Sequence, residues 1–231
     1  MTDMKLTELF RIFLKKGFVS KRLLFVGNLD EWENNVPPHP DYDVWVVEEI
    51  GDERLGEEHV QFLFENTASG LVRRMMPFVP DSAGEEHVIE RFESADCILF
   101  LVVERDSETP VGYTWTLIPS EDTFALDLRI DEGTCFGFDA FTAPGHRRRG
   151  VTTLCRAVAN DYAVERGCET LVGHVDAANK PALKAEDTSL LDHAGNNYLI
   201  RVLGLRLFSI TSWFDVPGLE LYLLPGRPQL R

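Results

Sequence analysis

Apolar residues recur along the chain with two different periods, which together predict a mixed α/β fold. The clearest helical pattern lies between Val151 and Ala163, where apolar positions are three and four residues apart. Two apolar runs of strand length, Cys97–Val103 and Val111–Leu117, flank turn residues at 106–110, so we expect a hairpin. Further strands are expected at residues 23–26, 43–50, 136–142, 170–175, 205–212 and 219–224.

The same patterns predict the remaining helices and one break. Residues 57–65 and 85–92 have helical spacing and precede the hairpin, and a polar stretch from Lys180 predicts a late helix. A Gly-Asn-Asn sequence that begins at Gly195 contains three turn-forming residues. We therefore expect regular structure to break there.

The first 40 residues form an N-terminal extension in this interpretation. Leu6, Leu9, Phe10 and Phe13 follow helical spacing, and a short strand comes after them. A loop rich in Pro, Asn and Asp at residues 35–43 then marks a soft boundary. We expect an extension at residues 1–40, made of a helix plus a short strand, and one main domain at 41–231.

Charge limits the partners of such a chain. The formal net charge is -15 and the pI is near 4.8, whereas a surface that binds nucleic acid normally carries a basic excess. We therefore expect no nucleic-acid partner, and any site for an anion must be local.

Cysteine spacing and hydropathy point to a cytoplasmic protein. Cys97, Cys135, Cys155 and Cys168 have neither metal-ligand nor disulfide-framework spacing, so we expect reduced, buried thiols and no bound metal. No apolar run approaches the roughly 20 residues that span a bilayer, and the first 20 residues lack a signal-peptide pattern. We expect no stable membrane insertion, although the helix at 6–13 leaves peripheral contact as an alternative to packing on the domain.

An arginine run stands where the amphipathic helix begins. Arg147, Arg148 and Arg149 lead into it through Gly150, although the positive end of the helix dipole disfavours cations there. Unpaired backbone N–H groups, a glycine and arginine charge together form a cradle for a phosphate. The alternative is an exposed basic turn that water or nearby carboxylates neutralise.

This spacing, Pro144-x-x-Arg147-x-x-Gly150-x-Thr152 between an apolar strand and an amphipathic helix, resembles motif A of the GNAT N-acetyltransferase superfamily. Thr152 departs from the pattern, because the family prefers Gly or Ala there. The resemblance implies an α/β (α+β) fold whose mixed, largely antiparallel, twisted central sheet is flanked by helices.

Other segments are similar to the family in order and spacing. They cover roughly residues 97–224, and they include Thr109–Tyr113, Asp139–Thr142, Asp176–Ala182 and Leu203–Arg206. One departure concerns Asn179 and Gly204, which stand about twice as far apart as in the family. Residues 186–197 therefore look inserted, in the region where many members place a tyrosine acid.

The resemblance implies an acetyl-CoA-dependent N-acetyltransferase that acetylates a primary amine by direct attack. Acetyl-CoA is the implied cosubstrate, and no metal is implied. The residues expected to bind it are Phe141, Thr142, Arg147, Arg148, Arg149, Gly150, Val151, Thr152 and Asn179. Backbone groups of Phe141 and Thr142 on one strand, and of His174 and Val175 on the next, match the positions that hold pantetheine.

For catalysis, Asp139 is the first candidate base and Tyr198 the candidate acid. His174 is an alternative base and His193 an alternative acid, while Asp139 also fits a buried structural carboxylate. Asn179 equally fits a helix N-cap.

The acceptor is expected to be a small-molecule or protein amine, and the acidic charge favours a cationic one. Monomer and homodimer both remain open. Two other classes stay in view: a catalytically silent acyl-CoA sensor of the same fold, and another nucleotide-binding α/β protein. The chain lacks Gly-x-Gly-x-x-Gly and Gly-Lys-Ser/Thr motifs, which counts against the second.

Overall fold

The computed structural model describes residues 19–67, 83–125, 128–186, 191–202, 205–213 and 223–225. The chain divides into two compact units. The larger unit contains Asn28–Thr123 and Ile130–Leu171, and the smaller unit contains Met1–Gly27, Phe124–Arg129 and Val172–Gln229. The strand β8, Thr170–Asp176, begins in the larger unit and continues in the smaller one.

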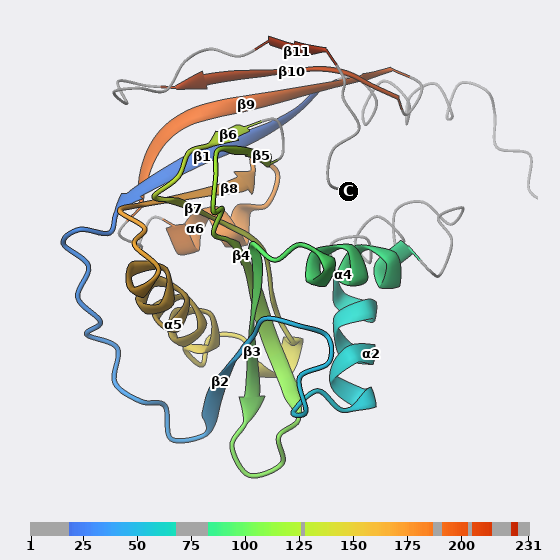
Figure 1. The fold of residues 1–231 in the computed structure, drawn as a ribbon, viewed down its shortest axis with the longest axis vertical. Coiled ribbons are helices and arrows are strands. Elements are labelled where there is room, and N and C mark those ends of the chain that lie inside the picture. The colour runs from blue at the N-terminus through green and yellow to red at the C-terminus, as the bar shows by residue number, and fades with distance from the viewer. Residues whose placement is uncertain are drawn as a thin grey trace, which may run out of the picture. The chain divides into compact units, whose positions relative to one another are not determined.

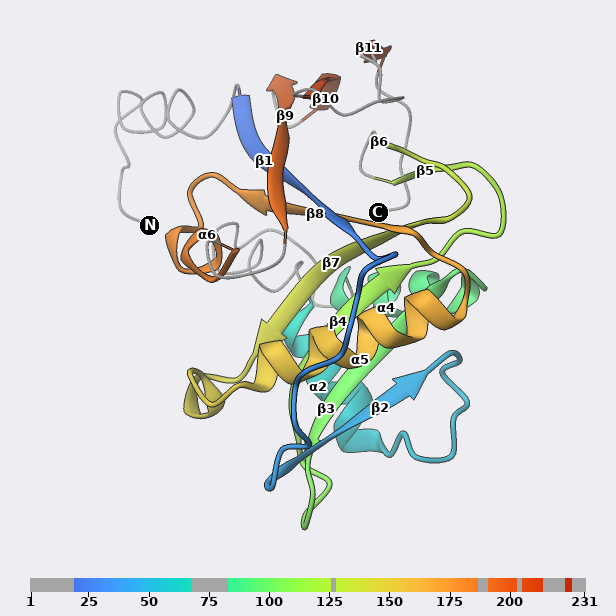
Figure 2. The same ribbon diagram turned by 90° about the vertical axis from the view of Figure 1, so that its left-hand side faces the viewer.

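The larger unit is an antiparallel sheet covered by helices on both faces (Figure 1). Its strand order is β2 (Tyr42–Val47), β3 (Cys97–Glu104), β4 (Pro110–Leu117), β7 (Thr134–Thr142). Helix α5 (Val151–Glu165) packs across one face, as Figure 2 shows. Helices α2 (Glu57–Asn66) and α4 (Ala83–Glu93) cover the other face. This arrangement confirms the predicted fold class.

The predicted hairpin is formed by β3 and β4, and the burial of both strands explains why their sequences are almost entirely apolar. Because helices cover both faces, Leu99, Phe100, Leu101 and Trp115 are all fully buried, so these strands are continuous apolar runs rather than alternating ones. On the α5 face, Phe100 packs in a core with Val111, Val151 and Cys155, among others. The apolar stripe of α5 thus meets the sheet as the helical spacing predicts.

The smaller unit contains a second run of strands in the order β8, β1 (Val19–Asn28), β9 (Asp192–Val202), β10 (Leu205–Trp213), β11 (Leu223–Pro225). Strands β1, β9, β10 and β11 pair antiparallel. The helix α6 (Lys180–Glu186) confirms the prediction from Lys180.

The predicted break at Gly195 is wrong, because β9 continues through it. Gly195 and Asn196 pair with Leu24 and Leu23 of β1, and a register shift between Leu24 and Phe25 absorbs the irregularity. Ladder pairing on both sides of β9 therefore overrides the turn preference of the Gly-Asn-Asn sequence.

Other predictions have mixed outcomes. The helix at residues 6–13 and most of the strand at 219–224 lie outside the described residues. Two short strands, β5 (Thr123–Ala125) and β6 (Leu128–Ile130), were not predicted and form a separate pair. The domain boundary at residue 40 stays a prediction.

All four cysteines are free and buried, as predicted for small apolar side chains. Within the part of the chain that is described, no helix has the length and apolar character to cross a bilayer.

Candidate functional site

The loop between β7 and α5 leaves backbone donors open at the start of the helix. A short 3-10 turn (Pro144–His146) follows β7, and Gly150 is the N-cap of α5 with φ of +81°. Only glycine adopts this left-handed conformation without strain. No side chain caps α5, so the first amides of the helix face an uncovered N-terminus.

The three arginines of this loop keep their charge available. Arg147 Nε donates to the Thr142 carbonyl oxygen at 3.2 Å, and Arg149 Nη1 donates to Tyr42 Oη at 3.3 Å. All three side chains are exposed, and among the described residues no carboxylate forms an ion pair with them. In the described part of the chain these arginines thus lack a direct ion pair, although Asp41 and Glu104 lie near enough to add to the rise in the pKa of Arg149, whose main cause is its hydrogen bond to Tyr42.

The hydroxyl of Thr152 lies against the preceding strand. Thr152 Oγ1 and Thr142 Oγ1 are 3.1 Å apart and share a hydrogen bond. The side chain of Val151 is buried in the core, so Val151 can offer a ligand only its backbone. Thus the threonine that stands at position 152, where the family prefers Gly or Ala, uses its hydroxyl to link the start of α5 to β7.

Two residues that the sequence did not reveal support the same loop. Tyr42 is 1% exposed, and its Oη is hydrogen-bonded to His146 Nδ1 at 2.8 Å. His39 packs against the Tyr42 ring with centroids 4.6 Å apart. Tyr42 belongs to β2, about a hundred residues before the loop, so no local motif announces it.

On the opposite face of the sheet, Asp139 occupies a β-bulge. The register between β4 and β7 shifts between Tyr113 and Trp115, and Asp139 has φ of +50°. Arg91 of α4 donates from Nη1 to Asp139 Oδ2 at 2.6 Å. Both side chains are largely buried, at 13% and 10% exposed. The candidate base is therefore held by an ion pair.

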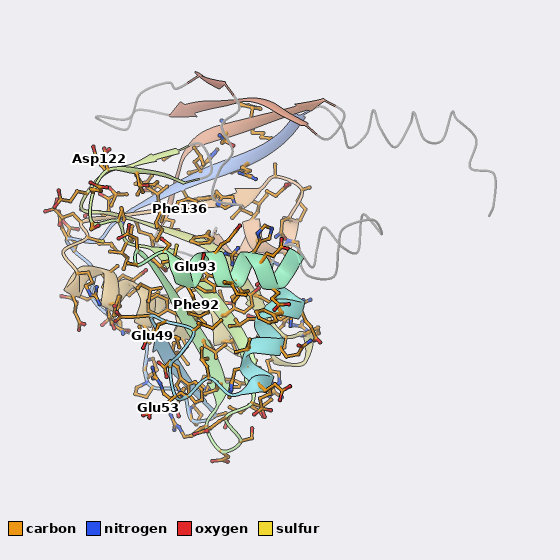
Figure 3. All side chains as sticks on the ribbon, turned by 45° about the vertical axis from the view of Figure 1, so that its right-hand side comes forward. Glu49, Glu53, Phe92, Glu93, Asp122 and Phe136 are labelled. Carbon is orange, nitrogen blue, oxygen red and sulfur yellow. The ribbon has the colours of Figure 1, made fainter. Side chains whose placement is uncertain are left out.

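Aromatic rings surround this ion pair. The Arg91 guanidinium lies over Trp115 at 5.2 Å and over Phe138 at 5.1 Å from the ring centroids. Phe92, labelled in Figure 3, packs edge-on against Trp115 at 5.0 Å. These contacts fix the guanidinium in position.

Tyr113 stands on the same face of β4 and is locked as a neutral phenol. Burial raises its pKa far above the ordinary value, and the nearby Asp139 carboxylate adds to the rise. Its Oη donates to the Asn66 carbonyl oxygen at 2.6 Å. Tyr113 therefore serves packing rather than proton transfer in this arrangement.

The remaining candidates lie on elements of the smaller unit. Asn179 Oδ1 accepts a hydrogen bond from the Ala182 amide at 3.3 Å, which is the capping role foreseen as its alternative. Tyr198 is in β9, with Lys21 Nζ 5.8 Å from its ring centroid. Burial lowers the pKa of His174 to about 3, and the Arg22 cation adds to the effect. Their roles in catalysis or cofactor binding stay predictions.

Among the residues that the structure describes, no three His, Cys, Asp or Glu side chains gather as metal ligands do.

The profile of the Acetyltransferase (GNAT) family matches residues 67–185. No curated protein matches the chain in sequence.

Solved structures share the fold at low identity. A functionally unknown conserved protein from Staphylococcus epidermidis is 11% identical, with a TM-score of 0.54 over 85% of this chain and 67% of its own. A tandem GNAT protein from the clavulanic acid biosynthesis pathway is 11% identical, with a TM-score of 0.52 over 83% of this chain and 57% of its own. A Drosophila protein is also 11% identical, with a TM-score of 0.51 over 86% and 57%. The chain thus spans under two thirds of the length of the last two structures, and the likeness concerns the fold alone.

Proposed function

Because the chain belongs to the GNAT acetyltransferase family, we propose that it transfers an acetyl group from acetyl-CoA to a primary amine. The observation that carries this proposal is the uncapped start of α5 beside three arginines without carboxylate partners among the described residues. Backbone donors, the helix dipole and arginine charge all favour an anionic group there.

The residues present fit a CoA pyrophosphate at this loop. Arg147, Arg148 and Arg149 supply charge, Gly150 allows close approach, and the amides of Val151 and Thr152 supply donors. Phe141 and Thr142, at the end of β7, are proposed to hold the pantetheine arm through their backbone. Asn179 stays a prediction from the sequence. Acetyl-CoA supplies an acetyl group activated as a thioester.

Asp139 is the proposed base, since its carboxylate is fixed in the bulge and attracts an incoming ammonium group. A His174 imidazole with a pKa of about 3 is a poor proton acceptor, which favours Asp139 over it. Tyr198 remains the proposed acid that returns a proton to the thiolate of CoA. The proposed acceptor is a small-molecule or protein amine in the cytoplasm.

One observation favours a second candidate, an acyl-CoA-binding protein without catalysis. Asp139 Oδ2 already accepts a short hydrogen bond from Arg91, so this oxygen is occupied by the guanidinium rather than open to an incoming amine. Such a protein binds acetyl-CoA and CoA, but it does not convert acetyl-CoA to free CoA when an amine is added.

Thermal melting of the purified protein with acetyl-CoA, CoA, NAD or ATP tests the proposal. A ligand at 100 times its dissociation constant stabilises the folded state by about 2.7 kcal/mol, which raises the melting temperature measurably. A rise with the CoA compounds alone supports the site, and release of CoA thiol with an amine then separates the enzyme from the sensor. No shift with any CoA compound at millimolar concentration contradicts the proposal.

A further inference from the structure

The face of the sheet beneath α4 holds a buried donor with no acceptor. Trp115 is fully buried in β4, and none of the described residues accepts a hydrogen bond from its Nε1–H. Buried polar groups in folded proteins nearly always have a partner, and an indole N–H can only donate. The indole N–H of Trp115 is therefore available to an acceptor that the described residues do not supply.

The guanidinium that stacks on this indole also has donors to spare. Arg91 carries five N–H donors, and only Nη1 is used, toward Asp139. Within the described part of the chain, no second acceptor lies within hydrogen-bonding distance of it. Its side chain is only 13% exposed, so water reaches few of the remaining donors. Arg91 and Trp115 together thus offer several unused donors beside the Asp139 carboxylate.

The hydrogen-bond donors of Arg91 and Trp115 determine which chemical group of a ligand can bind there. The planar fork of a guanidinium matches a carboxylate with two parallel hydrogen bonds, and a buried N–H nearby adds a third donor. An ammonium group suits the Asp139 carboxylate instead, because at Arg91 and Trp115 it would meet only donors and a like charge. The rings of Trp115, Phe138 and Phe92 exclude water and strengthen a charged hydrogen bond there.

We propose that Arg91 and Trp115 form a specificity subsite for a carboxylate carried by the acceptor amine. This inference rests on the proposed acetyl transfer and narrows its acceptor to amino-acid-like compounds. Asp139, already bonded to Arg91, places the proposed base beside the subsite. Arg91 thus acts as a binding residue for the acceptor and as a positioning residue for Asp139.

Matched amine pairs test the subsite directly. Each pair contains an α-amino acid and the amine left when its carboxylate is removed: lysine and cadaverine, tyrosine and tyramine, histidine and histamine. Acetylation is followed as CoA thiol release. At least one amino acid is expected to exceed its partner by about tenfold or more in kcat/KM, the scale of one charged hydrogen bond. Equal or better use of the decarboxylated amines overturns the inference.

Two variants locate the effect at the subsite. Trp115→Phe removes only the indole N–H and some ring area, so it is expected to raise the KM of the preferred amino acid several-fold, a larger effect than any fall in kcat. Arg91→Lys keeps the charge but loses the fork, and it is expected to reduce the preference within each pair. Trp45→Phe is the matched control, because Arg54 also stacks on Trp45, at 5.8 Å, on the outer strand β2. An equal KM change in the control overturns the assignment.

The failure of this inference is distinguishable from failure of the proposed function. If CoA compounds raise the melting temperature and amines are acetylated without regard to the carboxylate, only the subsite is wrong. If CoA compounds cause no shift, the cosubstrate site is wrong as well. If CoA binds but no member of any pair is acetylated, the amino-acid acceptor is rejected, because all three carboxylate-bearing members have failed.

Discussion

Arg149 joins two parts of the candidate CoA site, since it stands in the exposed loop before α5 and donates to a buried tyrosine. Arg149→Glu places a carboxylate where the pyrophosphate is proposed to lie. We expect CoA affinity to fall at least a hundredfold with the fold retained, because the side chain is exposed. Isothermal titration with CoA measures the change.

Arg166→Glu is the control for that variant, because it makes the same change in net charge near the other end of α5. It should leave CoA affinity within about twofold, since its position is remote from the proposed pyrophosphate. A folded Arg149→Glu protein that binds CoA normally would contradict the site.

A variant at Tyr42 tests how the hydrogen bonds that hold the arginine loop in place affect CoA binding, without changing the charge of the loop. Tyr42→Phe removes the hydroxyl that accepts from Arg149 and bonds His146. We expect a loss of about 1 kcal/mol in stability, the usual contribution of a hydrogen bond, and CoA binding about fivefold weaker. Urea unfolding and calorimetry measure the two effects. Tyr162→Phe on α5, whose hydroxyl bonds Glu48 at 2.7 Å, should leave CoA binding unchanged.

Individual site residues could be predicted from the sequence only where the residues that act together are neighbours in the chain. The arginine loop was recognisable because its residues adjoin each other and conflict with the helix dipole. Tyr42 and Arg91 were not, because each meets its partner only after distant strands and helices pack together. The ion pair of Asp139 was likewise invisible in the sequence.

At the scale of elements, β4, β7 and α5 approach one another closely at Gly112. A Cβ atom there would lie 2.9 Å from both the Phe141 carbonyl oxygen and Val151 Cγ1. Gly112→Ala should therefore cost about 1–3 kcal/mol in stability through overpacking. Urea unfolding checks this value.

Gly137→Ala in β7 provides the comparison, because its added Cβ would meet only Leu171 Cδ1 at 3.7 Å. It should be neutral or slightly stabilising, since alanine restricts the unfolded chain more than glycine does. A neutral result for both variants would mean that the contact at Gly112 yields easily.

Helices and strands whose own sequence has a clear hydrophobic period or turn signal could be predicted. A strand such as β9, which forms because neighbouring strands pair with it, could not. α5 and the β3–β4 hairpin follow the period and turn chemistry of their own sequences. β9 does not, since its Gly-Asn-Asn sequence is a strand only between β1 and β10. The short pair β5–β6 has too few residues to give a period.

At the scale of the whole molecule, stability should depend on pH through His174. Its pKa is about 3 in the folded protein and near 6.5 when unfolded, so the unfolded chain binds one more proton between these values. The free energy of unfolding therefore decreases as pH falls through 6.5. Between pH 7 and 5.5 the expected loss from His174 is on the order of 1 kcal/mol.

Urea unfolding of the protein and of His174→Gln at the two pH values measures this contribution. The variant should lose less stability on acidification, because glutamine does not titrate. Equal losses in both proteins would show that His174 takes up its proton without unfolding.

The place of β1 in the smaller unit has a consequence for how the protein matures. β1 lies between β8 and β9, and its residue Val19 pairs with Ile200, about 180 positions later. A growing chain leaves the β9-facing edge of β1 unpaired until residues 192–202 have been synthesised, whereas α5, which covers the sheet of the larger unit, already ends at Glu165. Long-range pairing of this kind is slow. We therefore expect the smaller unit to complete its folding last, and β1 to be the segment that most needs protection during synthesis.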